Sequence, residues 1–238
     1  MRKLFAGLVM AVTVLASVSQ AADSLPAAPD AARYQVDLTW PKRPLPNKWA
    51  IGPIAGFFVD ARDHVWVSHW QWGVLPNVAN AAANPPRGKC CIPAPHIMEF
   101  DTEGNVVQSW GGPGAGYDWP SNVHGVYVDD KDNVWIGGSK TRTGEDGVAP
   151  DGMLLKFTRD GKFLMQIGKR GASKGSLDPT QLSGASNVAV DPKTNEAYIS
   201  DGYGNHRVLV VDADTGKFKR QWGAYGKPPT DLDIGPYD

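Results

Sequence analysis

The sequence predicts an all-β protein, a β-propeller built from four-stranded antiparallel blades. Two observations predict it: a long unit recurs three times along the chain, and glycine-containing turns recur at the same place in each unit. The composition agrees, because 27 Gly, 19 Pro and 9 Trp suit short strands joined by turns, with large aromatic side chains packed between sheets. Long helices tolerate few Gly and Pro residues.

The first half of each unit is an apolar run that ends in Asp, followed by a polar turn and a second run that carries an aromatic residue. The three copies are Gly56 to Ser68, Gly125 to Gly137 and Asn187 to Ser200. Apolar runs of this length, bounded by polar turns, predict strands with at least one buried face. Each first half therefore predicts a hairpin.

The second half of each unit is another predicted hairpin. The three copies are Ile97 to Gly111, Leu154 to Gly168 and Val208 to Gly223. Each contains a turn glycine, which accepts the positive φ that other residues resist. The final glycine follows the turn glycine at the same interval in all three copies, and apolar residues alternate between them. Each unit thus predicts four short strands.

A single four-stranded meander cannot bury both faces, so repeated units of this kind predict propeller blades rather than a sandwich. We place the units at about 51–112, 119–169 and 182–226. Arg33 to Trp40 alternates and is expected to add an outer strand that closes the ring against the last blade, which would follow the three units seen here. Closed propellers usually carry about four to eight blades. With about three to four present, we expect this sequence to be a C-terminally truncated copy of a longer propeller.

The first residues predict export. Arg2 and Lys3 precede an apolar run and small residues at Ser19 to Ala21, the pattern of a signal peptide over residues 1–22. The propeller then occupies 23–238, in the periplasm or outside the cell, with no membrane span after cleavage. Without Arg2 and Lys3, 22 basic residues (24 less 2) stand against 25 acidic ones. No basic block appears, which argues against a nucleic-acid partner.

Long insertions separate the second and third strands of two units. The first, from about His69 to Pro95, is rich in Trp, Pro and Ala, and the second lies near Gly138 to Gly152. Long loops on a rigid scaffold often carry function, although such loops can also simply pack over a blade. Trp70 and Trp72 suit a flat apolar or sugar face, or burial between blade and insertion.

Cys90 and Cys91 are adjacent and are the only cysteines. In an exported chain we expect them to be oxidised, as a disulfide with each other or with other chains. The alternative is a soft-metal site formed with His96 and Met98.

The third unit, from Ala185 to Gly223, looks like an NHL repeat throughout, and the chain from about Gly52 to Gly226 resembles the peptidyl-α-hydroxyglycine α-amidating lyases. Their repeats carry a run similar to the one from Ser200 to Arg207. The resemblance implies a six-bladed propeller when complete, with a catalytic zinc ion held by three histidines in the central channel and a structural calcium ion. It implies a substrate peptide that ends in α-hydroxyglycine.

The resemblance also implies roles for single residues. His124 falls where the family has a zinc-binding histidine, and Tyr203 falls on the family's active-site tyrosine. His69 falls where the family has a histidine followed by an arginine that contacts substrate, but here the next residue is Trp70. His69 and Trp70 are therefore substrate-binding candidates, with Trp70 a departure from the pattern.

Two functions follow as hypotheses. The chain belongs to a zinc-dependent enzyme of the amidating-lyase type, acting on a peptide or small molecule at the channel, or to a non-catalytic propeller that holds a ligand or protein partner on one face. Three units alone cannot assemble a three-histidine site, so we expect this copy to be inactive by itself.

Overall fold

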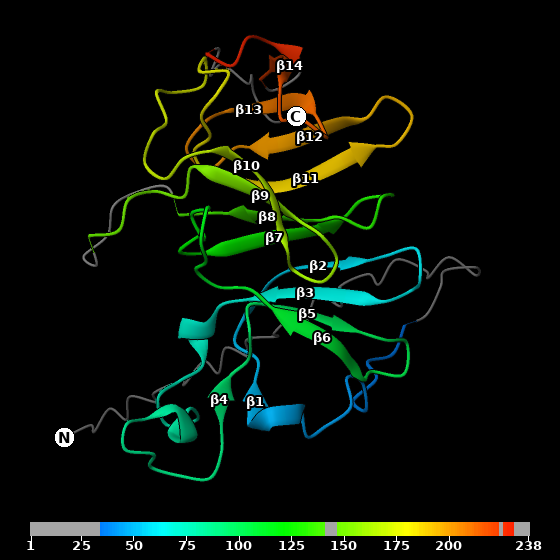
Figure 1. Ribbon diagram of the computed structural model, residues 1–238, viewed down its shortest axis with the longest axis vertical. Helices are drawn as coiled ribbons and strands as arrows, with labels where there is room; N and C mark the ends of the chain where they lie inside the picture. The colour runs from blue at the N-terminus through cyan, green and yellow to red at the C-terminus, as the bar shows by residue number, and fades with distance from the viewer. Residues whose placement is uncertain (1–33, 141–146, 224–225, 231–238) are drawn as a thin grey trace, which may run out of the picture. The chain divides into compact units, whose positions relative to one another are not determined.

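The structure is a computed structural model that describes residues 34–140, 147–223 and 226–230 (Figure 1). The chain divides into a unit Met1–Asp37 and a compact unit Leu38–Asp238. The predicted signal peptide lies outside the described residues. No helix within them has the length and apolarity needed to cross a membrane.

Three four-stranded antiparallel sheets form the fold, and each is a meander in chain order, as the sequence predicts (Figure 1). The three blades consist of β2(Ile54–Val59), β3(Val65–His69), β5(Ile97–Phe100) and β6(Val106–Trp110); β7(Val123–Val128), β8(Val134–Gly138), β9(Met153–Phe157) and β10(Phe163–Gly168); and β11(Ala185–Asp191), β12(Glu196–Asp201), β13(Arg207–Asp212) and β14(Phe218–Trp222). The protein is therefore an all-β propeller with three blades in the part that the structure describes.

In the first two blades, the aspartate that ends the first strand explains why the turn repeats. Asp60 Oδ1 accepts the backbone N–H groups of Arg62 (2.8 Å) and His64 (3.0 Å), and its Oδ2 accepts the indole N–H of Trp66 (2.9 Å). In the second blade the Asp129 carboxylate accepts the indole N–H of Trp135 in the same way (2.9 Å). One carboxylate thus fixes the turn and the orientation of the large aromatic side chain that follows it.

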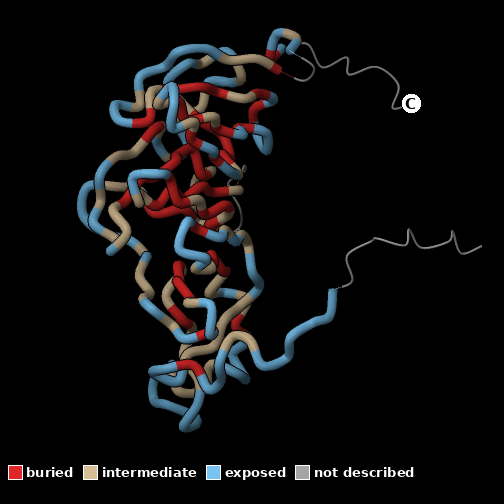
Figure 2. The backbone as a smooth tube through the Cα atoms, turned by 90° about the vertical axis from the view of Figure 1, so that its right-hand side faces the viewer, coloured by how far each residue is buried: buried red, intermediate tan, exposed pale blue. Residues whose placement is uncertain are grey.

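The blades pack face to face through two apolar cores. Trp66 of the first blade packs against the face of the second blade that is turned toward the first, called its leading face below. Trp135 of the second blade packs against the leading face of the third in the same way. The first strands β2, β7 and β11 lie beside one another in that order. In Figure 2 the buried segments gather in the interior and the exposed segments on the outside. This arrangement brings the beginnings of neighbouring first strands close together.

The strand expected from Arg33 to Trp40 is not formed in the part that the structure describes, and the last blade with which it was expected to pair is not among the described residues. Residues 34–40 contain no strand, and Arg33 lies outside the described residues. Tyr34 and Leu38 are almost fully exposed. Alternation yields a strand only where an edge pairs with it, and no described edge does so here.

The residues that follow, 40–51, form an N-terminal arm, which includes η1(Pro46–Lys48) and β1(Trp49–Ala50). Trp40 and Leu45 of this arm pack on Val67, Met98 and Phe100 of the first blade.

The first insertion forms a lobe, residues 70–93, called the insertion lobe below. It contains η2(Gln71–Gly73), η3(Asn80–Ala82) and β4(Ile92–Pro93), and β4 pairs in parallel with β1. The second insertion is described only in part, so its role remains a prediction.

Candidate functional site at the start of the second and third blades

A buried polar network holds the loop that follows β12. Asp201 accepts hydrogen bonds from Arg207 Nε (2.9 Å), from Asn205 Nδ2 (2.7 Å) and from the backbone N–H of Ser183 (2.8 Å). The side chains of Asp201 and Arg207 are fully buried. Because this ion pair is enclosed and saturated with hydrogen bonds, it fixes the loop that carries Tyr203.

The structure brings together His124, the predicted zinc ligand, and Tyr203, the predicted active-site tyrosine. His124 lies in β7 and Tyr203 on the loop after β12, and the Tyr203 hydroxyl is 3.0 Å from His124 Nε2. The other ring nitrogen, Nδ1, is 3.1 Å from the carbonyl oxygen of Ser186 in β11. His124 is half-buried and Tyr203 is exposed.

These contacts assign the protons. A carbonyl oxygen only accepts, so His124 Nδ1 carries the proton and donates it to Ser186. Nε2 is then the acceptor, and Tyr203 donates its hydroxyl proton to it. The pair presents an exposed phenol whose proton has a base ready to receive it, which is an arrangement able to exchange a proton with a bound ligand.

His69, a predicted substrate-binding residue, is fully buried at the end of β3. Its Nδ1 accepts the backbone N–H of Gly52 (3.1 Å), and its Nε2 donates to the Pro95 carbonyl (2.9 Å). Burial lowers the pKa of the imidazole, which favours the neutral form. Both ring nitrogens are engaged within the protein, so this geometry ties the residues directly after the arm and after the insertion lobe to the blade and offers no polar atom to a ligand.

Trp70, the other predicted substrate-binding residue, links the insertion lobe to the second blade. Its indole N–H donates to the Val123 carbonyl (2.7 Å), directly before His124 in the chain. Its ring stacks on Trp72 at a centroid distance of 5.0 Å and an interplanar angle of 18°. Trp70 is partly buried, whereas Trp72 is exposed.

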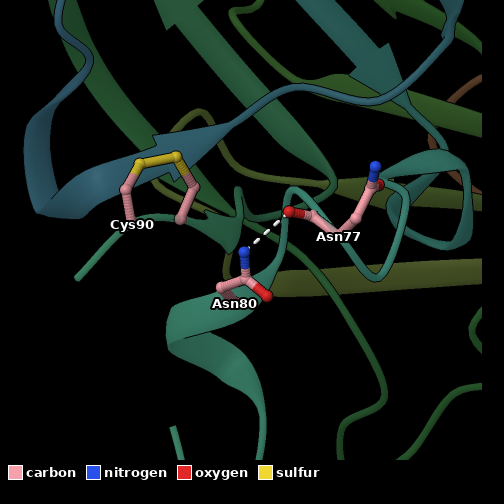
Figure 3. Close-up of a disulfide and its surroundings, with 4 residues drawn as sticks. Asn77, Asn80 and Cys90 are labelled. Atoms are coloured by element: carbon pink, nitrogen blue, oxygen red, sulfur yellow. Dashed lines mark hydrogen bonds between the residues drawn. A yellow bond between two sulfur atoms is a disulfide. The ribbon is translucent and has the colours of Figure 1, made fainter. Parts of the chain in front are cut away.

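A disulfide joins Cys90 to Cys91 in the insertion lobe (Figure 3). The alternative soft-metal site with His96 and Met98 is not formed. Met98 is fully buried in the core under the N-terminal arm, and no group of three or more His, Cys, Asp or Glu in the described part of the chain includes either cysteine.

A second polar cluster, which the sequence did not predict, lies between the first two blades. Ligand atoms of Asp60, His64 and Glu99 all lie within 4.8 Å of one another, an arrangement that can hold a metal ion. His64 Nδ1 is 2.6 Å from Glu99 Oε1. Arg159 of the second blade bonds to both carboxylates, with 2.6 Å to Asp60 Oδ2. The guanidinium thus already supplies positive charge to this cluster.

Of the residues in this cluster, only Asp60 could be singled out from the sequence. Asp60 belongs to the repeated turn, but Glu99 and Arg159 come from different blades and meet through packing. Burial alone would raise the pKa of Asp60. Hydrogen bonds from the Trp66 indole and the Arg159 guanidinium outweigh it and lower the pKa to about 2.

No protein-family model matches the sequence. Among solved structures the chain is similar to a virginiamycin B lyase from Staphylococcus aureus (13% identity, TM-score 0.40), covering 75% of this chain and 43% of that one. It is also similar to a gluconolactonase from Xanthomonas campestris (16% identity, TM-score 0.42), covering 74% of this chain and 49% of that one. The chain spans less than half the length of these proteins, and the likeness concerns the fold alone.

Proposed function

We propose that this propeller binds a peptide or small-molecule ligand where β7 and β11 begin, and that His124 and Tyr203 exchange a proton with it. The observation that carries the proposal is the 3.0 Å contact between the Tyr203 hydroxyl and His124 Nε2, with the histidine proton fixed on Nδ1 by Ser186. The phenol is exposed, so a ligand can reach it.

The pair works as a unit in this proposal. When a ligand group gives a proton to the Tyr203 oxygen, the phenol passes its own proton to His124 Nε2, and the imidazole becomes an imidazolium; in the reverse direction Nε2 returns that proton to the phenol oxygen as the phenol releases one to the ligand. Ser186 keeps the ring in one tautomer, so that Nε2 always faces the phenol. The fixed loop after β12 keeps Tyr203 in place without a large reorganisation.

The resemblance to the amidating lyases adds a more specific proposal, that His124 is one of the ligands of a zinc ion. A zinc-bound histidine usually donates its other N–H to a carbonyl, as His124 does. Catalytic zinc, however, takes about three protein ligands. Of the other four histidines, His69 has both ring nitrogens engaged and His64 bonds to Glu99. Among the described residues, neither His96 nor His206 belongs to a group of three or more His, Cys, Asp or Glu that could hold a metal ion. The described residues therefore fit one ligand and not a complete zinc site, and we derive no catalytic step through the metal.

Metal analysis tests this part. Because a single protein ligand holds zinc weakly, we expect an equilibrium titration of the purified protein with zinc to show weak binding that becomes weaker in His124→Ala. His206→Ala is the matched control, because it removes an exposed histidine and leaves His124 untouched. Zinc binding that is equally strong in His124→Ala and in the control excludes His124 as a zinc ligand.

A second candidate, a non-catalytic binding propeller, is favoured by the stacked Trp70 and Trp72. An exposed indole held flat by a second, anchored indole suits a flat apolar or sugar face. Either candidate is proposed to act in the periplasm or outside the cell, on the pattern of the first 22 residues. Calcium, also implied by the resemblance, remains a prediction.

A further inference from the structure

The insertion lobe differs in charge from the rest of the chain. The sequence holds 25 acidic residues, yet none lies between His64 and Met98. Within the lobe the charged side chains are Arg87 and Lys89, and both are exposed. Neither forms an ion pair with any residue that the structure describes. The lobe is therefore a locally cationic surface on a chain whose net charge is −1.

The same lobe exposes large apolar side chains. Trp72, Leu75 and Val78 are 64%, 59% and 42% exposed. The backbone N–H of Val78 donates to the Leu75 carbonyl (2.8 Å), so these two residues lie one turn apart. Trp72 is held from behind by Trp70. Exposed apolar side chains gathered on one lobe are typical of an interaction surface.

Backbone hydrogen bonds hold the apolar and the cationic parts of the lobe together. The N–H of Cys91 donates to the Val78 carbonyl (2.9 Å), and the N–H of Arg87 donates to the Asn80 carbonyl (2.9 Å). Asn80 Nδ2 in turn donates to the Asn77 carbonyl (2.7 Å), beside the disulfide (Figure 3). The disulfide closes only one peptide unit, so it gives little chain-entropy stabilisation and acts on the local shape of this segment.

We propose that the insertion lobe docks the protein onto an anionic lipid surface. Trp72, Leu75 and Val78 would enter the boundary between headgroups and acyl chains, where indoles are favoured. Arg87 and Lys89 would lie at the level of the lipid phosphates. A bilayer accepts exposed aliphatic and indole groups together with unpaired cations without any particular shape. An acidic protein would need a surface complementary in shape to the apolar groups, so we favour the bilayer. The proposal does not depend on the function of His124 and Tyr203.

Vesicle sedimentation tests the proposal. The protein without its predicted signal peptide, residues 23–238, is mixed with vesicles of phosphatidylcholine alone, or with phosphatidylglycerol as about a third of the lipid. We expect binding to the anionic vesicles only, and weaker binding as salt is raised. Arg87→Glu with Lys89→Glu should weaken binding at least about fivefold for each charge removed. Trp72→Ser with Leu75→Ser should weaken it by a similar or larger factor.

Matched controls change the same residue types elsewhere. Leu177→Ser removes an exposed leucine outside the lobe, and Lys162→Glu with Lys193→Glu makes the same charge change on exposed turns of other blades. Circular dichroism confirms folding of each variant. The proposal is overturned if the protein does not bind anionic vesicles, which would leave an acidic protein as the partner, or if the control variants lose binding as much as the lobe variants.

Discussion

At the scale of single residues, one carboxylate in each of the first two blades, Asp60 and Asp129, bonds both to its turn and to a tryptophan indole. Asp60 accepts two backbone N–H groups, orients Trp66 and pairs with Arg159 of the next blade. Its side chain is almost completely buried. A buried carboxylate with this many donors is stabilised in its charged form, which is why its pKa lies well below the ordinary value.

Acid should therefore remove the contribution of Asp60 to folding. Its pKa is lowered from 3.8 to about 2, so the stabilisation is fully present above pH 3.8 and declines as the pH falls towards 2. It amounts to about 2 kcal/mol, at about 1.4 kcal/mol per pKa unit. We expect Asp60→Asn to lose about that much unfolding free energy at neutral pH, measured by urea denaturation, with the difference from the wild type shrinking between pH 4 and pH 2. A difference that stays constant over this range would contradict the assignment.

At the scale of elements, the N-terminal arm covers the apolar face of the first blade, as a preceding blade covers the corresponding face of the second and third. In the second and third blades the leading face packs against the neighbour's tryptophan. In the first blade Trp40 and Leu45 of the arm cover Val67, Met98 and Phe100 of that face. The strand β2 itself is left uncovered, and its Ile54, Phe57 and Val59 are exposed. The arm thus acts as an end cap of the kind that repeat folds need.

Removing a side chain from the cap should destabilise the protein. Leu45 is 6% exposed, so Leu45→Ala leaves a cavity over the first blade, and we expect a loss of about 2–5 kcal/mol in unfolding free energy. Leu38→Ala is the control, because Leu38 is 90% exposed and its truncation should cost little. Chemical denaturation followed by tryptophan fluorescence measures both. Equal effects of the two substitutions would show that the arm does not cap the blade.

At the scale of the whole molecule, each pair of neighbouring blades is joined by an ionic contact at equivalent positions with the charges exchanged. Glu99 of the first blade pairs with Arg159 of the second. Lys156 of the second blade donates to the Ala213 carbonyl of the third (2.8 Å) and lies 3.6 Å from Asp214. Because the sign is reversed between the two contacts, a blade set beside the wrong neighbour would bring like charges together.

Arg159 should therefore couple the first blade to the second. Arg159→Met leaves Asp60 and Glu99 buried without their cation, which is expected to cost about 3–5 kcal/mol. We expect hydrogen exchange to become faster in β2, β3, β5 and β6 than in the third blade. Arg62→Met is the control, since the pair of Arg62 with Asp132 is about half exposed and such pairs contribute about 0–1 kcal/mol. Uniform acceleration over all three blades would argue against a local coupling role.

The sequence by itself determined the blades, because periodic strands, turn glycines and the repeated aspartates are local features, each readable within one unit. The resemblance also singled out His124 and Tyr203. Their contact was decided only by the tertiary structure, since it depends on how β7 packs beside β11 and on the loop held by Asp201 and Arg207. The same holds for the burial of His69, for the cluster around Arg159 and for residues 34–40, where an alternating run formed no strand. Local pattern fixes which segments become strands, whereas contacts between blades depend on which faces meet in space, and no single unit encodes that.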